Sequence, residues 1–373
     1  MTGASPPPPP SPADRFLRGA PWPGGAGVAY PRADPADVAR LPADTWGTAA
    51  IPAGVRLELV GDATALRLDV ETFTDDLGYR GDGAGTTLIA LVGDDVLDEV
   101  PVALGRSTVE LQLGGRAGGE APVVVHLPEG MRPVVHAVTP VGGTIEPARP
   151  GPRWLCYGDS IAEGWIATGP AWSWPARVAR RHRLDLVNLG YAGAARGEIA
   201  SAEQIAALPA DVVSLSHGTN CWCRTPHSAA MVHAGFDAFL AIVRQGHPDI
   251  PIVVVSPVVR PDAEATANRL GATLADLRGA IEDVVTGRSA QDARLRLVRG
   301  RRLLEPDLLP DGIHPGDEGH ARLADAIGPV VAAAAATGDG AAAAGAAVAG
   351  AAVAGAAVAG AAGEGDGTAG IGA

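Results

Sequence analysis

The chain has 373 residues, 47% of them hydrophobic, so it is long enough to form two domains with buried cores. Its formal net charge of −13 argues against nucleic acid as the main partner, because a phosphate backbone requires a basic surface. The three cysteines, Cys156, Cys221 and Cys223, do not form a disulfide framework, and the latter two lack the spacing of a zinc knuckle or a redox CxxC motif.

The first 25 residues contain the run SPPPPPSP, a composition that predicts a disordered, Pro-rich lead over residues 1–25. This segment has no basic stretch followed by an apolar run, so it does not have the pattern of a secretory signal. The expected location is therefore the cytoplasm, with export by another route as the alternative.

Alternating apolar side chains mark the next part of the chain. In residues 66–70 and 109–113 every second side chain is apolar, and further apolar stretches lie in residues 86–95, 98–104 and 122–127. Short strands of period two, separated by Gly-Asp and Gly-Gly turns, are typical of an antiparallel sandwich. We expect a jelly-roll-like β-sandwich domain over residues 26–148.

A Pro-rich boundary near residue 150 begins a domain expected over residues 149–335, in which apolar runs alternate with helical stretches. The expected strands are 153–158, 184–190, 211–218, 251–257 and 295–300; the expected helices are 173–183, 198–207, 228–246, 270–287 and 317–332. This alternation predicts a parallel sheet covered on both faces, with its site at the carboxyl ends of the strands. The basic run RVARRHR (177–183) is interpreted as the solvated face of a helix.

Residues 336–373 are rich in alanine and glycine and repeat the sequence GAAVA three times in tandem. The segment is long enough to span a membrane, but alanine and glycine are weakly apolar and no aromatic or basic anchors flank it. We therefore expect a low-complexity tail and no membrane span.

Polar motifs follow the expected strands. Gly158-Asp159-Ser160 follows one strand, NLGYAG (188–193) and HGTN (217–220) follow the next two, and DGIHPGDEGH (311–320) lies after the last. Acyl transfer needs a nucleophile, a base, a group that orients the base, and donors for an oxyanion. Taken alone, the serine is better explained as a helix cap than as a nucleophile.

Together these motifs resemble those of the SGNH (GDSL-type) hydrolases, over residues 153–332. The resemblance implies a flavodoxin-like, three-layer α/β/α catalytic domain that acts as a serine esterase. It also implies that Ser160 is the nucleophile, that His314 is the general base and that Asp311 orients it. Asp159 is interpreted as support for the turn.

The resemblance extends to the oxyanion hole. It implies that the Ser160 N–H, the Gly193 N–H and the Asn220 side-chain amide hold the developing negative charge. The chain departs from the family pattern at Cys221, where the GxND motif has an aspartate. We expect Cys221 to pack as a small apolar group, with an oxidisable thiol switch as the alternative.

Two other arrangements of the same residues are less consistent with the sequence. A classical α/β-hydrolase would have G-x-S-x-G, but Ala162 stands in place of the second glycine. His314, Glu318 and His320 could form a metal cluster, but Pro315 and Gly316 break the helix that such a site would need. No metal and no cofactor are expected.

The sandwich resembles the jelly-roll domain that precedes the catalytic domain in carbohydrate esterases of the family 2 type. With the hydrolase motifs it implies a small-molecule ester substrate with an acetyl-type acyl group, an O-acetylated carbohydrate being one candidate. A thioesterase or lysophospholipase of the same fold is one alternative, and a carbohydrate-binding protein with an inactive hydrolase domain is another. Four tryptophans are candidates either for stacking on a sugar or for the core: Trp165, Trp172, Trp174 and Trp222.

Overall fold

The computed structural model describes residues 11–75, 85–114 and 121–337. The expected Ala/Gly-rich tail lies outside these residues from residue 338 on, and so do the first ten residues of the expected lead. Within the described ranges, no helix combines the length and the apolar character needed to cross a membrane.

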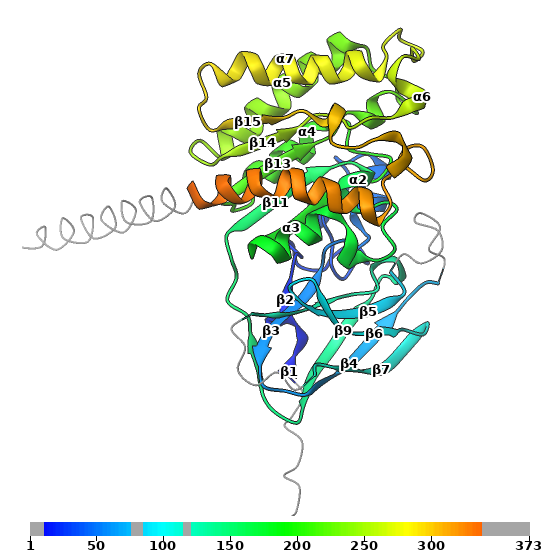
Figure 1. Ribbon diagram of the computed structural model, residues 1–373, viewed down its shortest axis with the longest axis vertical. Coiled ribbons are helices and arrows are strands. Elements are labelled where there is room, and N and C mark those ends of the chain that lie inside the picture. The colour runs from blue at the N-terminus through cyan, green and yellow to red at the C-terminus, as the bar shows by residue number, and fades with distance from the viewer. Residues whose placement is uncertain (1–10, 76–84, 115–120, 338–373) are drawn as a thin grey trace, which may run out of the picture.

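The N-terminal part consists of two antiparallel sheets that pack face to face (Figure 1). One has the order β1-β9-β4-β7, and the other β10-β3-β8-β5-β6 with β2 beside β3. The strands are β1 (Ser11–Pro12), β2 (Leu17–Arg18), β3 (Arg56–Gly61), β4 (Ala65–Thr72), β5 (Thr87–Val92), β6 (Asp95–Pro101), β7 (Gly105–Gln112), β8 (Val123–His126), β9 (Val134–Val141) and β10 (Ile145–Pro147). The alternation in β4 is confirmed, since Leu66, Leu68 and Val70 are all fully buried.

The lead is shorter than the expected 1–25, because the chain enters the sandwich at its first described residue. Strand β1 pairs with β9, β2 pairs with β3, and the side chain of Phe16 between them is fully buried in the sandwich core. Composition alone missed this, because the apolar Phe16 follows the proline run by only a few residues and its partners lie far along the chain.

The C-terminal part is built on a five-stranded parallel sheet of order β12-β11-β13-β14-β15. Its strands are β11 (Arg153–Gly158), β12 (Asp185–Gly190), β13 (Val212–Ser216), β14 (Ile252–Val255) and β15 (Leu295–Val298). Strands β11 to β14 are buried almost throughout, which explains their continuous apolar sequences. This strand order is the flavodoxin-like one, and it reverses direction between β11 and β13.

Helices cover both faces of the parallel sheet. The helices are α1 (Ala43–Ala49), α2 (Ser160–Glu163), α3 (Trp174–His182), α4 (Ile199–Ala207), α5 (Ala229–Gly246), α6 (Pro261–Glu264) and α7 (Leu274–Ser289), followed by a C-terminal helix described over residues 317–337. Helices α4, α5 and α7 share one core with the sheet, and α3 and the C-terminal helix share the other. The predicted fold class is therefore confirmed: a three-layer α/β/α domain preceded by an antiparallel β-sandwich.

The two parts are joined by more than one linker. Helix α3 lies between the parallel sheet and the sandwich (Figure 1), and Arg180 of α3 donates to the carbonyl of Gly93 in the sandwich at 3.0 Å. The segment before β3 also crosses to the other side, because Ala33, Leu41 and Ala49 are buried in the core of α4, α5 and α7. Some residues before position 50 therefore contribute to the core of the α/β/α domain. The boundaries expected from the sequence assign residues 26–148 to the sandwich alone.

The burial of Phe16 allows a test of whether the first described residues of the chain are folded against the sandwich. We expect Phe16→Ala to lower the free energy of unfolding by about 3–5 kcal/mol, because it removes a buried aromatic ring and leaves a cavity. The control is Phe73→Ala, where the ring is 59% exposed and little should change. Urea unfolding followed by circular dichroism measures both, and equal small effects would place Phe16 outside the core.

Candidate active site

The proposed nucleophile, Ser160, is the first residue of α2 and directly follows β11. Asp159 caps this helix, because its Oδ1 accepts the N–H of Ile161 at 3.0 Å, which agrees with its interpretation as support for the turn. Gly158 is required for close packing, since a Cβ there would lie 2.5 Å from the Cβ of Ala162. The N–H of Ser160, at the start of a helix, needs no acceptor inside that helix.

The structure brings the three proposed triad residues into one chain of hydrogen bonds. Ser160 Oγ lies 2.8 Å from His314 Nε2, and His314 Nδ1 lies 2.7 Å from Asp311 Oδ2. Burial raises the pKa of Asp311, but hydrogen bonds from His314 and Ile313 outweigh it and hold this pKa below its usual value. An ionised carboxylate only accepts hydrogen bonds, so Nδ1 carries the imidazole proton and Nε2 can accept the Ser160 proton.

Two side chains hold the histidine loop against the segment after α2. His320 Nε2 donates to the carbonyl of Trp165 at 2.9 Å, and the ring of Trp165 lies 5.1 Å from that of His314. Asp317 accepts both the N–H and the hydroxyl of Thr168, at 2.9 and 2.6 Å. His320 and Asp317 therefore tether loops, and among the described residues no group of three or more potential ligands is arranged to hold a metal ion.

The proposed oxyanion donors lie at the same edge of the sheet. Gly193 has a φ of +69°, a conformation that glycine adopts most readily, and its N–H has no backbone or side-chain acceptor within the described part of the chain. The Asn220 amide donates one N–H to the carbonyl of Ala194, next to Gly193, and retains a second. Ser160 and Asn220 follow β11 and β13, the two strands between which the strand order reverses, where ligands bind in such sheets.

Sequence reasoning missed a buried arginine, Arg32, which contacts the backbone just before residues 191–193. These residues, which carry the proposed donor Gly193, are called the oxyanion loop. The Arg32 side chain is fully buried and donates to the carbonyls of Asn188 (3.2 Å), Gly190, Thr48 (2.7 Å) and Ile51. No motif marks it, because it stands in an irregular segment more than 150 residues before its main partners along the chain.

Arg32 also faces Glu163 at the end of α2. Its Nη2 lies 3.6 Å from Glu163 Oε2, and both side chains are completely buried. The same oxygen accepts the N–H of Ala192 at 2.7 Å, one residue before Gly193. Glu163 thus connects helix α2, which begins with the proposed nucleophile, to the oxyanion loop. Arg32 supplies the opposite charge that a buried carboxylate requires.

Cys221, which replaces the family aspartate, is 2% exposed. Burial raises the pKa of its thiol to about 12, and its Sγ lies 3.8 Å from the carbonyl oxygen of Arg196. A thiol with this pKa is rarely the reactive thiolate near neutral pH. These features favour the expected packing role over a redox switch.

The four candidate tryptophans separate into two groups. Trp174 is 1% exposed and packs against Trp154 in the core, while Trp172 packs on Ile89 and Leu91 of the sandwich. Trp165 lies beside His314, and Trp222 follows the Asn220 turn, so these two are the candidates for contact with a substrate.

The Arg32–Glu163 pair leads to a stability and activity test. We expect Arg32→Met to lower the free energy of unfolding by about 3–5 kcal/mol, because it leaves the buried Glu163 carboxylate without its opposite charge. It should also lower kcat, because the oxyanion loop loses its support. Adding Glu163→Gln to Arg32→Met should restore part of the free energy of unfolding and part of kcat. The uncharged amide no longer needs a cation, and its oxygen still accepts the Ala192 N–H.

Urea unfolding and p-nitrophenyl acetate turnover measure these effects. The matched control is Arg40→Met, which removes an arginine whose side chain is 53% exposed and should change neither quantity. A fully active and stable Arg32→Met protein would contradict the positioning role.

The cysteines lead to a labelling test. We expect iodoacetamide at pH 8 to modify Cys223, which is partly exposed, well before the buried Cys221 and Cys156, because burial raises the pKa of each buried thiol to about 12. Peptide mass spectrometry measures the order of labelling. Cys221→Ser should leave peroxide sensitivity unchanged, and loss of that sensitivity would instead support the redox switch.

Known proteins resemble this chain in sequence and in fold. Residues 156–322 match the model of the GDSL-like lipase/acylhydrolase family. No curated protein matches the chain. Among solved structures, a salicylyl-acyltransferase, SsfX3 from a tetracycline biosynthetic pathway, is 28% identical, with a TM-score of 0.70 over 83% of this chain and 92% of that one.

Two further structures share the two-part architecture. One, titled as a GDSL-like lipase from Bacteroides ovatus, is 20% identical with a TM-score of 0.71, covering 86% of this chain and 96% of that one. The other, a family two carbohydrate esterase from Clostridium thermocellum in complex with cellohexaose, is 17% identical with a TM-score of 0.52, covering 74% and 90%. At these identities they show a shared fold. Residues 156–322, a little under half of the chain, therefore form a domain similar to the GDSL-like lipases/acylhydrolases, and this match together with the shared fold supports an ester hydrolase.

Proposed function

We propose that this protein is a serine esterase that removes small acyl groups, acetyl-type groups on carbohydrate hydroxyls foremost, through an acyl-enzyme on Ser160. The observation that carries the proposal is the continuous hydrogen-bond chain from Ser160 through His314 to Asp311, beside the donors of Gly193 and Asn220.

The proposed reaction follows from the directions of these hydrogen bonds. Ser160 Oγ attacks the ester carbonyl and gives its proton to His314 Nε2, which passes it to the leaving alcohol. The Ser160 and Gly193 N–H groups and the second Asn220 amide N–H stabilise the negative charge on the carbonyl oxygen. Water, activated by the same imidazole, then releases the acid, and Asp311 stabilises the imidazolium each time it forms.

Two observations support a polar alcohol as the leaving group. The guanidinium of Arg224 lies 4.0 Å from the place where a Cβ on Gly193 would stand, so a charged, exposed side chain borders the oxyanion side of the site. A hydroxyl-rich alcohol suits such a border better than a lipid chain. The fold likeness to a family two carbohydrate esterase supports a sugar as this alcohol.

Acyl transfer to an acceptor alcohol is a second candidate, supported by the 28% identity to a salicylyl-acyltransferase over most of both chains. The chemistry up to the acyl-enzyme is the same, and the two functions differ only in whether water or a hydroxyl group accepts the acyl group. Thioesterase and lipase activity remain alternatives that the choice of substrate distinguishes.

The decisive experiment compares p-nitrophenyl esters of increasing acyl length, and acetylated against free sugars. We expect acetate to be the best substrate, and Ser160→Ala to lower kcat by roughly 10⁴-fold or more. Asp311→Asn should lower kcat by roughly 10⁴-fold, because the imidazole then adopts the wrong tautomer. Asp307→Asn, an exposed aspartate nearby in sequence, is the matched control.

Three readouts separate the candidates. Labelling by a fluorophosphonate should require both Ser160 and His314, and equal turnover by wild type and Ser160→Ala would disprove the enzymatic role of the serine. Preference for long acyl chains would favour a lipase, and preference for acyl thioesters a thioesterase. With an alcohol added, a new ester in place of free acid would assign the protein as a transferase.

A further inference from the structure

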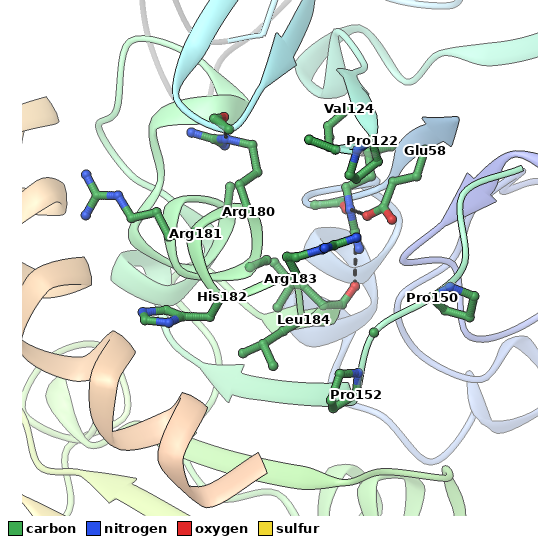
Figure 2. A pocket seen from close by; sticks show the side chains of 18 of the residues that line it. Glu58, Pro122, Val124, Pro150, Pro152, Arg180, Arg181, His182, Arg183 and Leu184 are labelled. Carbon is green, nitrogen blue, oxygen red and sulfur yellow. Dashed lines mark hydrogen bonds and ion pairs between the residues drawn. The ribbon is translucent and has the colours of Figure 1, made fainter. Parts of the chain in front are cut away.

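A cavity of about 530 Å³ lies between the sandwich and the hydrolase domain (Figure 2). Strands β3 and β8 line one side, the linker of residues 149–152 a second, and the end of α3 a third. Figure 2 shows Arg180, Arg181 and His182 along the α3 side, with Pro150 and Pro152 across from them. A volume of this size is typical of small-molecule sites.

The cavity is distant from the catalytic serine. It contacts Leu184, just before β12 begins, whereas the catalytic residues lie past the opposite ends of the strands. A six-residue strand such as β12 separates the two regions by roughly 17 Å. The cavity is therefore a second site and not an extension of the first.

Positive charge surrounds this cavity in a protein whose net charge is −13. Its lining includes one acidic residue, Glu58, and seven basic residues: Arg56, Arg149, Arg180, Arg181, Arg183, His126 and His182. Three of the arginines come from the run RVARRHR, which the sequence predicted to be a solvated helix face. The run instead forms one wall of an interdomain cavity.

Some of these arginines already have partners. Arg180 is buried and donates to the carbonyl of Ala171 (2.7 Å), and its Nη1 lies 3.3 Å from His126 Nε2. Arg56 is paired with Glu58 and with Asp185.

Two arginines remain available. Arg149 and Arg183 are exposed and have no hydrogen-bond or ion-pair partner among the described residues. A guanidinium offers a planar fork of donors that matches a carboxylate or phosphate group, so an unpaired pair of them at one cavity suits an anion.

His126 belongs to the buried part of the lining. Its side chain is buried and its Nε2 faces the Arg180 guanidinium, which only donates, so the imidazole proton lies on Nδ1. Burial, with the charges of Arg180 and Arg56, lowers the pKa of His126 well below its usual value and keeps the ring neutral. The Nδ1 atom has almost no accessible surface, so the neutral ring contributes shape to the cavity and no donor for an occupant.

The remaining lining is apolar. It includes Pro122, Val124, Pro150, Pro152, Ala176 and Ala179. The proline rings are rigid, which keeps the shape of this wall constant. Such a surface favours a ligand with an apolar body in addition to its charged group.

We propose that this cavity binds a small organic anion, a carboxylate or phosphate group on an apolar body, with Arg149 and Arg183 as donors. The carboxylate or phosphate accepts hydrogen bonds from the guanidinium groups at the rim, and the apolar body lies against the prolines and α3. Because both domains line the cavity, an occupant also joins them.

Isothermal titration calorimetry on the full-length Ser160→Ala protein tests the proposal without turnover. The probes are benzoate, phenyl phosphate and the neutral benzamide, which share a phenyl ring and differ in charge. We expect saturable binding of at least one of the two anions and none of benzamide; the tighter anion identifies the preferred head group. Binding should weaken with added salt, since exposed arginines contribute to it.

The matched variants decide the outcome. The double variant Arg149→Gln/Arg183→Gln should weaken anion binding at least about tenfold, as expected for lost charge-assisted hydrogen bonds. Its melting temperature should stay unchanged, because both side chains lack protein partners among the described residues. Arg296→Gln, on the exposed face of the opposite edge strand β15, should bind as the parent does.

Three results would overturn the proposal. Neither anion binds the parent at millimolar concentration; the double variant binds as tightly as the parent; or benzamide binds as well as benzoate. The last result would show an apolar cavity with no role for the arginines.

Discussion

The buried ion pair between Arg32 and Glu163 is the constraint on which the rest of the active site depends. Both side chains are completely buried, so each charge needs the other together with further polar partners. Arg32 meets the carbonyls of Asn188 and Gly190 at the end of β12, while Glu163 holds the N–H of Ala192. Helix α2, the loop that carries the proposed oxyanion donor Gly193, and the N-terminal segment are thereby held at one point.

This arrangement makes the N-terminal part of the chain a structural component of the enzyme. Arg32 and the helix α1 that follows it come from the N-terminal part, yet they pack in the core of the hydrolase domain. A second set of contacts, from Arg180 to Gly93 and from Arg56 to Leu186, joins the sandwich to the other side of the sheet. The sandwich and the hydrolase domain are therefore joined through polar contacts, the one from Arg56 being buried, as well as by the linker.

The active site itself uses short, local devices that a parallel sheet collects at one edge. A serine at the start of a helix, a left-handed glycine and an asparagine after a third strand each require only a few residues of chain. The Asp311–His314 pair is local too, because the carboxylate bonds to both the ring and the backbone N–H of a residue three positions later. Replacement of the family aspartate by Cys221 leaves these devices intact, since the cysteine packs behind them.

The sequence by itself determined the strands of the parallel sheet, the longer helices that cover it and the motif residues, because hydrophobic periodicity and local turn chemistry act within a few residues of chain. It predicted β11 at its observed bounds and named Ser160, Gly193, Asn220, Asp311 and His314, which the structure places at one edge of the sheet. Only the tertiary structure decided the partners of Arg32, the burial of Phe16 and the cavity formed by the RVARRHR run. These features depend on contacts between residues far apart in the chain, where packing of the two domains, and not local propensity, selects the neighbours.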